Sequence, residues 1–131
     1  MATSEEALNT ARILDQAYRQ SVEASVQDVT KLLQGRLSRK LTAYIAGVKD
    51  AKSVTRWANG EVVGMRLESE KRLRAAYEIA QLLTQYDSPQ TVRAWFIGMN
   101  PQLNDISPAE AIHEGRLKEA LSAARAYVAD G

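Results

Sequence analysis

Apolar residues recur three and four positions apart along most of the chain, the spacing that places them on one face of an α-helix. No alternating apolar–polar run is longer than four residues, and no internal repeat is present. The pattern therefore predicts an all-α protein. The longest run predicts a helix over residues 66–86 with a buried face of Leu73, Ala76, Tyr77, Ala80 and Leu83. Its outer face is expected to carry the i, i+4 ion pairs Glu68/Arg72, Glu70/Arg74 and Arg74/Glu78.

Capping residues, glycines and prolines divide the remaining chain into shorter helices. We expect N-caps at Ser4, Ser25, Ser38 and Asp50. The first helix should run to about residue 20 and pack on the main body or on a second copy of the chain through Leu8, Ala11, Leu14, Ala17 and Tyr18. Gly35 is expected to end the second helix. Further helices are expected over residues 38–46, 51–58, 89–98, 108–115 and 116–129.

Residues 43–61 predict two helices separated by a tight turn at Gly47. The first of these helices should bury Tyr44, and the second should bury Val54 and Trp57. The same register turns three polar side chains outward: Lys52, Ser53 and Arg56. This is the layout of a helix-turn-helix, whose second helix enters the major groove of DNA. The turn is one residue longer than in the tightest form of the motif, so we expect it to be loosened.

The charge distribution supports a polyanion partner for this segment. Residues 36–74 carry a net charge of +6, against −2 for residues 1–35 and −3 for residues 75–131. The candidate base-reading residues are Lys52, Ser53 and Arg56, because arginine can bind guanine through two hydrogen bonds. The candidate phosphate contacts, which set register rather than sequence, are Arg36, Arg39 and Lys40. A helical hairpin with a solvated face is the alternative.

Candidates for catalysis are few. The chain has no cysteine, and His113 is its only histidine, which excludes most histidine-based metal sites. We expect His113 to be satisfied or solvent-facing on a short surface helix. Glu110 and Glu114 have the spacing of an acid–base pair, but this spacing is common on solvated helices. With no phosphate-binding glycine loop and no apolar run of about 18–20 residues, we expect a protein that is not an enzyme and does not span a membrane.

The order of motifs after residue 55 is informative. The helix-turn-helix ends in Arg-Trp-Ala-Asn-Gly-Glu (56–61), and Arg-Leu-Arg-Ala-Ala-Tyr-Glu-Ile-Ala (72–80) follows. A helix with Trp95 then precedes Asn100-Pro101-Gln102-Leu103, Ser107-Pro108-Ala109-Glu110-Ala111-Ile112 and Glu114-Gly115-Arg116. Over residues 25–131 this order resembles the Xre/MbcA/ParS family of antitoxins. It departs from the family at Asn104-Asp105, where small residues are usual.

The resemblance implies a helix-turn-helix DNA-binding region at residues 25–64 and a small helical toxin-binding domain at residues 65–131. Residues 1–24 form an N-terminal helical extension outside it. The implied partner is a toxin of the RES-domain type, which degrades NAD, and the implied location is the cytoplasm. By position, residues 116–131 would obstruct the toxin's active site.

Within the part of the chain that would bind the toxin, the resemblance implies the candidate contacts Arg116, Arg125 and Tyr127. Three further residues match the family signature: Trp95, Leu103 and Pro108. Each is as well suited to shaping the domain as to contacting a toxin. The resemblance also implies repression of the protein's own promoter by a homodimer, since two recognition helices one DNA turn apart read a palindrome. The alternative is a stand-alone DNA-binding regulator of a phage or mobile element, without a toxin partner.

Overall fold

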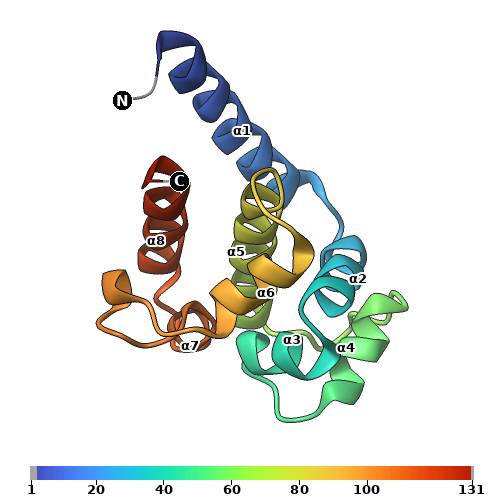
Figure 1. The fold of residues 1–131 in the computed structure, drawn as a ribbon. Helices are drawn as coiled ribbons and strands as arrows, with labels where there is room; N and C mark the ends of the chain where they lie inside the picture. The colour runs from blue at the N-terminus through green and yellow to red at the C-terminus, as the bar shows by residue number, and fades with distance from the viewer. Residues whose placement is uncertain (1–2, 131) are drawn as a thin grey trace.

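Residues 3–130, which the computed structural model describes, form eight α-helices and one short 3-10 helix and contain no strand (Figure 1). The elements are α1 (Ser4–Glu23), α2 (Val26–Arg36), α3 (Arg39–Ala46), α4 (Ala51–Ala58), α5 (Leu67–Leu83), α6 (Pro89–Ile97), η1 (Pro101–Leu103), α7 (Pro108–His113) and α8 (Leu117–Asp130). The all-α prediction is confirmed. Gly131, the last residue of the segment expected to obstruct a toxin, lies outside the described residues, as do Met1 and Ala2 of the N-terminal extension.

The corner between α3 and α4 is set by local sequence, as predicted. The Ser38 hydroxyl accepts a hydrogen bond from the Leu41 amide at 3.0 Å and so caps the start of α3. Gly47 ends α3 with a φ of 84°, a left-handed conformation that a residue without a Cβ adopts at little cost. The Asp50 carboxylate then accepts from the Lys52 amide at 2.8 Å and caps α4.

Two expected helix ends were wrong. Thr3, not Ser4, caps α1: its hydroxyl accepts from the Glu6 amide at 3.0 Å, and the Glu6 carboxylate accepts from the Thr3 amide at 3.3 Å. This reciprocal capping box needs a glutamate three residues after the cap, which Thr3 has and Ser4 lacks. Gly35 lies inside α2, because the Leu37 amide still bonds the Leu33 carbonyl and carries the helix to Arg36.

The central helix is α5, which contacts α1, α2, α3, α7 and α8. All five residues of its predicted stripe are buried, and so are Ile79 and Leu82 on its other sides. One apolar cluster extends from Ala17 on α1 to Val128 on α8. Because α5 is covered on several sides, the expected outer face was only partly right: the Glu70/Arg74 pair forms on it, but Glu78 does not lie on a solvated face. Glu78 is only 8% exposed.

The arginines of α5 bind the backbone of other helices instead of forming the full set of expected ion pairs. Of the three pairs, only Glu70/Arg74 is within ion-pair distance among the described residues, with 2.8 Å between Arg74 Nε and the Glu70 carboxylate. Arg74 Nη1 also donates to the carbonyls of Ser21 at 2.8 Å and Ala24 at 2.7 Å, which fixes the end of α1 on α5. Arg72 Nε donates to the Ile112 carbonyl at 3.2 Å.

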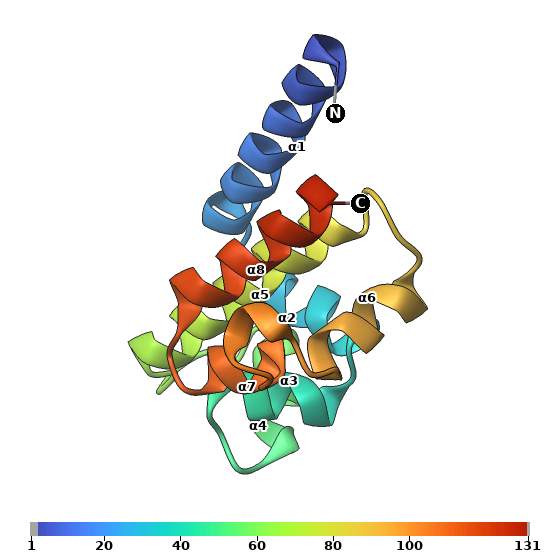
Figure 2. The same ribbon diagram turned by 60° about the vertical axis from the view of Figure 1, so that its left-hand side comes forward.

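Helices α1 and α7 are placed differently from the sequence expectation. The N-terminal half of α1 extends beyond the rest of the body in both views (Figures 1 and 2). Within its predicted stripe Leu8 is exposed, because only the C-terminal half of α1 packs on α5. In that half Ala17 and Ser21 are buried, whereas Tyr18 is exposed. The expected surface helix α7 is instead largely buried, since it packs against α3, α5, α6 and α8.

Among residues 3–130, no helix combines the length and apolar character needed to cross a bilayer.

Candidate functional surfaces

Helix α4 has one buried and one exposed face, as the sequence predicted. Val54 and Trp57 are buried, whereas Lys52 and Arg56 are exposed and Ser53 is partly exposed. Arg56 Nη2 donates to the Ser53 hydroxyl at 3.3 Å, so these two side chains lie side by side on the outer face. The outer face of α4 thus presents donors that can reach base edges or phosphates.

A hollow of about 470 Å³ lies between α4, the turn that precedes it and the start of α5. We call it the basic hollow, after the three cationic side chains that line it: Lys49, Arg56 and Arg66. Ser53 and Ser69 add hydroxyl groups to the lining. Sequence reasoning named Ser53 and Arg56 but missed Lys49 and Arg66. The +6 charge of residues 36–74 includes both, but their positions depend on how the loops on either side of α4 fold.

The other predicted DNA contacts lie outside the basic hollow. Arg39 Nη1 donates to the Thr55 hydroxyl at 3.1 Å and so links the start of α3 to α4. The Arg36 carbonyl accepts from Arg93 Nε at 3.3 Å, and Lys52 is exposed on α4. The six predicted residues are therefore spread over the end of α2, the start of α3 and the outer face of α4 rather than meeting at one point.

Lys40 lines a second hollow, of about 660 Å³, together with Tyr44, Lys49 and His113. The expectation that Tyr44 is buried was wrong: it is 40% exposed, because its ring lies against His113 at the protein surface rather than in the core. Burial of the hydroxyl raises the pKa of Tyr44, and the charges of Glu110 and Glu114 raise it further. Glu110 and Glu114 thus place negative charge near the Tyr44 hydroxyl.

A groove of about 380 Å³ lies between α6, η1 and the last two turns of α8. We call it the aromatic groove. Trp95 is partly buried in it, with its ring 5.4 Å from that of Phe96 and 6.3 Å from that of Tyr127. The Tyr127 hydroxyl donates to the Asp87 carboxylate at 2.7 Å, which fixes the end of α8 to the loop after α5. The remaining lining residues are Asn100, Pro101, Gln102, Ala123, Ala126 and Asp130.

Two large apolar residues between Trp95 and Asn100 in the chain are exposed. Ile97 is 58% exposed and Met99 is 81% exposed. Neither was singled out from the sequence, because helical spacing gives no reason for them to be outside the core. Exposed large apolar side chains are typical of surfaces that bind another protein.

The structure brings together only two of the six predicted toxin contacts, Trp95 and Tyr127. Leu103 and Pro108 are buried, which favours the alternative that they shape the domain. Arg116 lies at the opposite end of α8 from Tyr127, where its Nε donates to the Glu119 carboxylate at 3.0 Å. Arg125 is exposed, and its charge acts to lower the pKa of Glu78.

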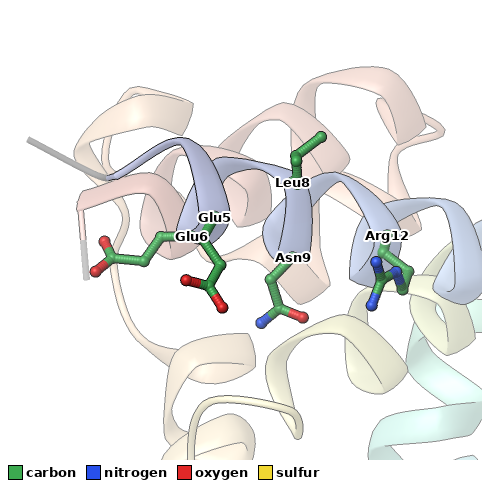
Figure 3. A pocket seen from close by; sticks show the side chains of 5 residues that line it. All are labelled: Glu5, Glu6, Leu8, Asn9 and Arg12. Carbon is green, nitrogen blue, oxygen red and sulfur yellow. The ribbon is translucent and has the colours of Figure 1, made fainter.

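A further hollow lies on the first turns of α1 (Figure 3). Its five lining side chains, those of Glu5, Glu6, Leu8, Asn9 and Arg12, all come from this one helix and are exposed. Because no second element forms an opposite wall, we assign it no role. Within residues 3–130, no group of three or more histidine, aspartate or glutamate side chains is placed to hold a metal ion.

Comparison with known proteins agrees with the sequence resemblance. The mycobacterial cidal antitoxin MbcA of Mycobacterium tuberculosis is 26% identical to this chain over 101 residues, which is 74% of this chain and 88% of MbcA. MbcA of Mycobacterium bovis gives the same values. This chain is similar to an antitoxin. No family model matches the chain, and no solved structure matches it.

The similarity to MbcA supports an antitoxin role. The aligned region spans about three quarters of the chain, so it includes α3, α4 and α5 wherever it begins. The resemblance is therefore not confined to the C-terminal motifs.

Proposed function

We propose that this protein is an antitoxin that binds a cognate RES-type, NAD-degrading toxin and represses its own promoter in the cytoplasm. The observation that carries the antitoxin role is the similarity to MbcA over 88% of that protein. The finer parts of the proposal rest on two surfaces. Residues 65–131 carry the aromatic groove, which we assign to the toxin, and residues 25–64 carry α4, which we assign to DNA.

The two surfaces lie at opposite ends of α5. Arg66 and Ser69, at the start of α5, line the basic hollow. Asp87, just after the end of α5, holds Tyr127 in the aromatic groove. A helix of the length of α5 (Leu67–Leu83) spans about 25 Å. This separation supports simultaneous binding of DNA and of a toxin, which repression by a toxin–antitoxin complex requires.

For the toxin, we propose that the aromatic groove is the anchor and that the last turns of α8 obstruct the toxin's active site. Trp95 and Tyr127 supply rigid aromatic surface, and the exposed Ile97 and Met99 lie between Trp95 and Asn100 in the chain. Aromatic anchors at the centre of an interface contribute most of the binding energy in many complexes. Arg125, one turn from the end of α8, is an exposed cation available to an acidic group of the toxin.

For DNA, we propose that α4 enters the major groove with Lys52, Ser53 and Arg56 toward the bases. Arg36, Arg39 and Lys40 would then contact backbone phosphates beside it. A homodimer places two copies of α4 one DNA turn apart, which predicts a palindromic operator. A stand-alone regulator with the same α3–α4 corner remains the second candidate, because the basic hollow favours DNA binding whether or not a toxin exists.

The deciding experiment is growth of cells that express the neighbouring open reading frame with and without this protein. We expect growth arrest and a fall in cellular NAD, both relieved by co-expression, and co-purification of the two proteins. Met99→Glu, which places a charge at the exposed residue directly before Asn100 of the aromatic groove, should abolish the rescue. Leu8→Glu, a matched change at the exposed Leu8 of α1, should leave the rescue intact. A neighbouring product without toxicity, or toxicity that this protein does not relieve, would favour the stand-alone regulator.

A further inference from the structure

The basic hollow gathers cations from three separate segments of the chain. Lys49 lies in the loop between α3 and α4, Arg56 lies on α4, and Arg66 directly precedes α5. No carboxylate is among the residues that line the hollow. Three positive charges that share one concave surface repel each other, and the repulsion is relieved when an anion occupies it.

The acidic residues nearest in sequence leave this positive charge uncompensated. The Asp50 carboxylate is directed to the Lys52 amide at the start of α4, and Glu61 and Glu68 are exposed and lie outside the lining. For the described residues, none of the ion pairs includes Lys49, Arg56 or Arg66. The hollow therefore presents cations whose charges are available to a ligand.

The walls of the basic hollow suit a small anion that remains attached to a larger molecule. Trp57 is buried beneath it, and the Ser53 hydroxyl adds a polar group beside Arg56. Val63 is completely exposed on the loop that forms the rim, and Gly64 turns that loop with a φ of 86°. Guanidinium and ammonium groups form short, charge-assisted hydrogen bonds with phosphate oxygens. The open rim leaves room for a chain that continues on either side of the phosphate.

We propose that the basic hollow binds one backbone phosphate of DNA through Lys49 and Arg66, beside the base-reading face of α4. The proposal rests on the DNA-binding part of the proposed function and adds two contacts to it. Neither residue lies on α4. Both are therefore placed to contact the DNA backbone that flanks the major groove rather than the base edges. Such contacts fix the register of a recognition helix and carry no sequence information.

The test is a titration of the full-length protein with its promoter duplex and with an unrelated duplex at several salt concentrations. For Lys49→Ala and for Arg66→Ala, we expect affinity for both duplexes to fall by roughly three- to tenfold at the same salt concentration. The slope of log affinity against log salt should become shallower by about 0.9 for each variant. Arg12→Ala on α1 and Lys118→Ala on α8 remove exposed cations elsewhere and should leave both quantities unchanged.

Folding does not obscure this test. Arg66 occupies the N-cap position of α5 without a side-chain cap bond, and a cation there opposes the helix dipole, so its removal should not destabilise α5. Rescue from the toxin by Arg66→Ala should equal rescue by the wild type, which separates this inference from the antitoxin role. If the wild type binds DNA and neither variant changes affinity or slope, the phosphate site is wrong and the DNA-binding proposal stands. If the wild type binds neither duplex, both are overturned.

Discussion

The imidazole ring of His113 lies flat against the phenol ring of Tyr44, with ring centroids 4.2 Å apart and an angle of 6° between the planes. His113 Nδ1 also lies 2.6 Å from the Tyr44 carbonyl oxygen, where a protonated Nδ1 donates a hydrogen bond. Tyr44 is in the last turn of α3 and His113 is the last residue of α7. The pair therefore joins the corner that we assign to DNA to the domain that we assign to the toxin.

We predict that His113→Ala lowers the free energy of unfolding by about 1–2 kcal/mol. The change removes both an aromatic pair, worth about 0.5–1.5 kcal/mol, and a hydrogen bond, worth about 1 kcal/mol. Urea denaturation followed by circular dichroism measures the effect, with Lys118→Ala on α8 as the control. An unfolding midpoint equal to that of the wild type would show that the stacked pair adds nothing to stability.

The Tyr127–Asp87 hydrogen bond predicts a pH-dependent contribution to stability. The bond raises the pKa of the Tyr127 hydroxyl, and burial and the Asp87 charge raise it further. Because the pKa is higher in the folded state, the stabilisation is present below the ordinary phenol pKa of about 10 and is lost as pH rises through the raised value. We predict that Tyr127→Phe lowers the free energy of unfolding by about 0.5–1.5 kcal/mol at pH 8.

The difference between Tyr127→Phe and the wild type should shrink as the pH is raised above about 10. Unfolding curves at pH 8 and at successively more alkaline pH measure it. Tyr86→Phe is the matched control, since Tyr86 is exposed to a similar extent and its hydroxyl has no hydrogen-bond partner among the described residues. A difference that persists unchanged at high pH would rule out titration of Tyr127 as its source.

Features that depend on a few neighbouring residues were predictable from the sequence. The capping of α3 and α4 by Ser38 and Asp50, and the left-handed turn at Gly47, each follow from one residue type at one position. The buried faces of α4 and α5 followed from helical spacing. These signals are local, because the groups that satisfy a helix end lie within three or four residues of it.

Features that depend on contacts between distant segments were not predictable. Arg74 has the spacing of an outer-face ion pair, but its guanidinium reaches the carbonyls at the end of α1, about fifty residues earlier. The basic hollow combines Lys49 and Arg66, which lie on opposite sides of α4 in the chain. The aromatic groove likewise needs Trp95 and Tyr127 to meet. Helical periodicity shows which face of a helix is buried but does not identify what covers it.

Glu78 was expected in an ion pair on the outer face of α5, but the structure buries it. Burial raises the pKa of this carboxyl, while the Arg125 charge and the Ser21 hydroxyl act in the opposite direction. The folded state therefore favours the protonated form, and stability falls as pH rises from the ordinary glutamate pKa, near 4.3, through the raised value.

We predict that Glu78→Gln unfolds at a higher urea concentration than the wild type at pH 7, because the amide avoids the cost of burying a charge. The advantage should disappear below about pH 4, where the wild-type carboxyl is protonated in both states. Glu61→Gln changes an exposed carboxyl in the same way and serves as the control. A Glu78→Gln protein that is less stable than the wild type at pH 7 would mean that attraction to Arg125 outweighs the burial.

Two glycine substitutions of the same kind should change stability in opposite directions. Gly47 has a left-handed φ of 84°, and a Cβ there would lie 3.3 Å from Arg72 Nη1. We predict that Gly47→Ala lowers the free energy of unfolding by about 1–2 kcal/mol, because a side chain is strained in that conformation. Gly35 lies inside α2 with no atom within 4 Å of an added Cβ.

Gly35→Ala should therefore raise the free energy of unfolding by about 0.5–1 kcal/mol, since alanine restricts the unfolded chain and favours helix. Both variants are compared with the wild type by urea denaturation under identical conditions. Opposite shifts would confirm that the left-handed backbone at residue 47 requires glycine. They would also show that residue 35 is an ordinary helical position, where alanine is more stabilising than glycine. If Gly35→Ala were destabilising, α2 would have to end before residue 35, as the sequence alone suggested.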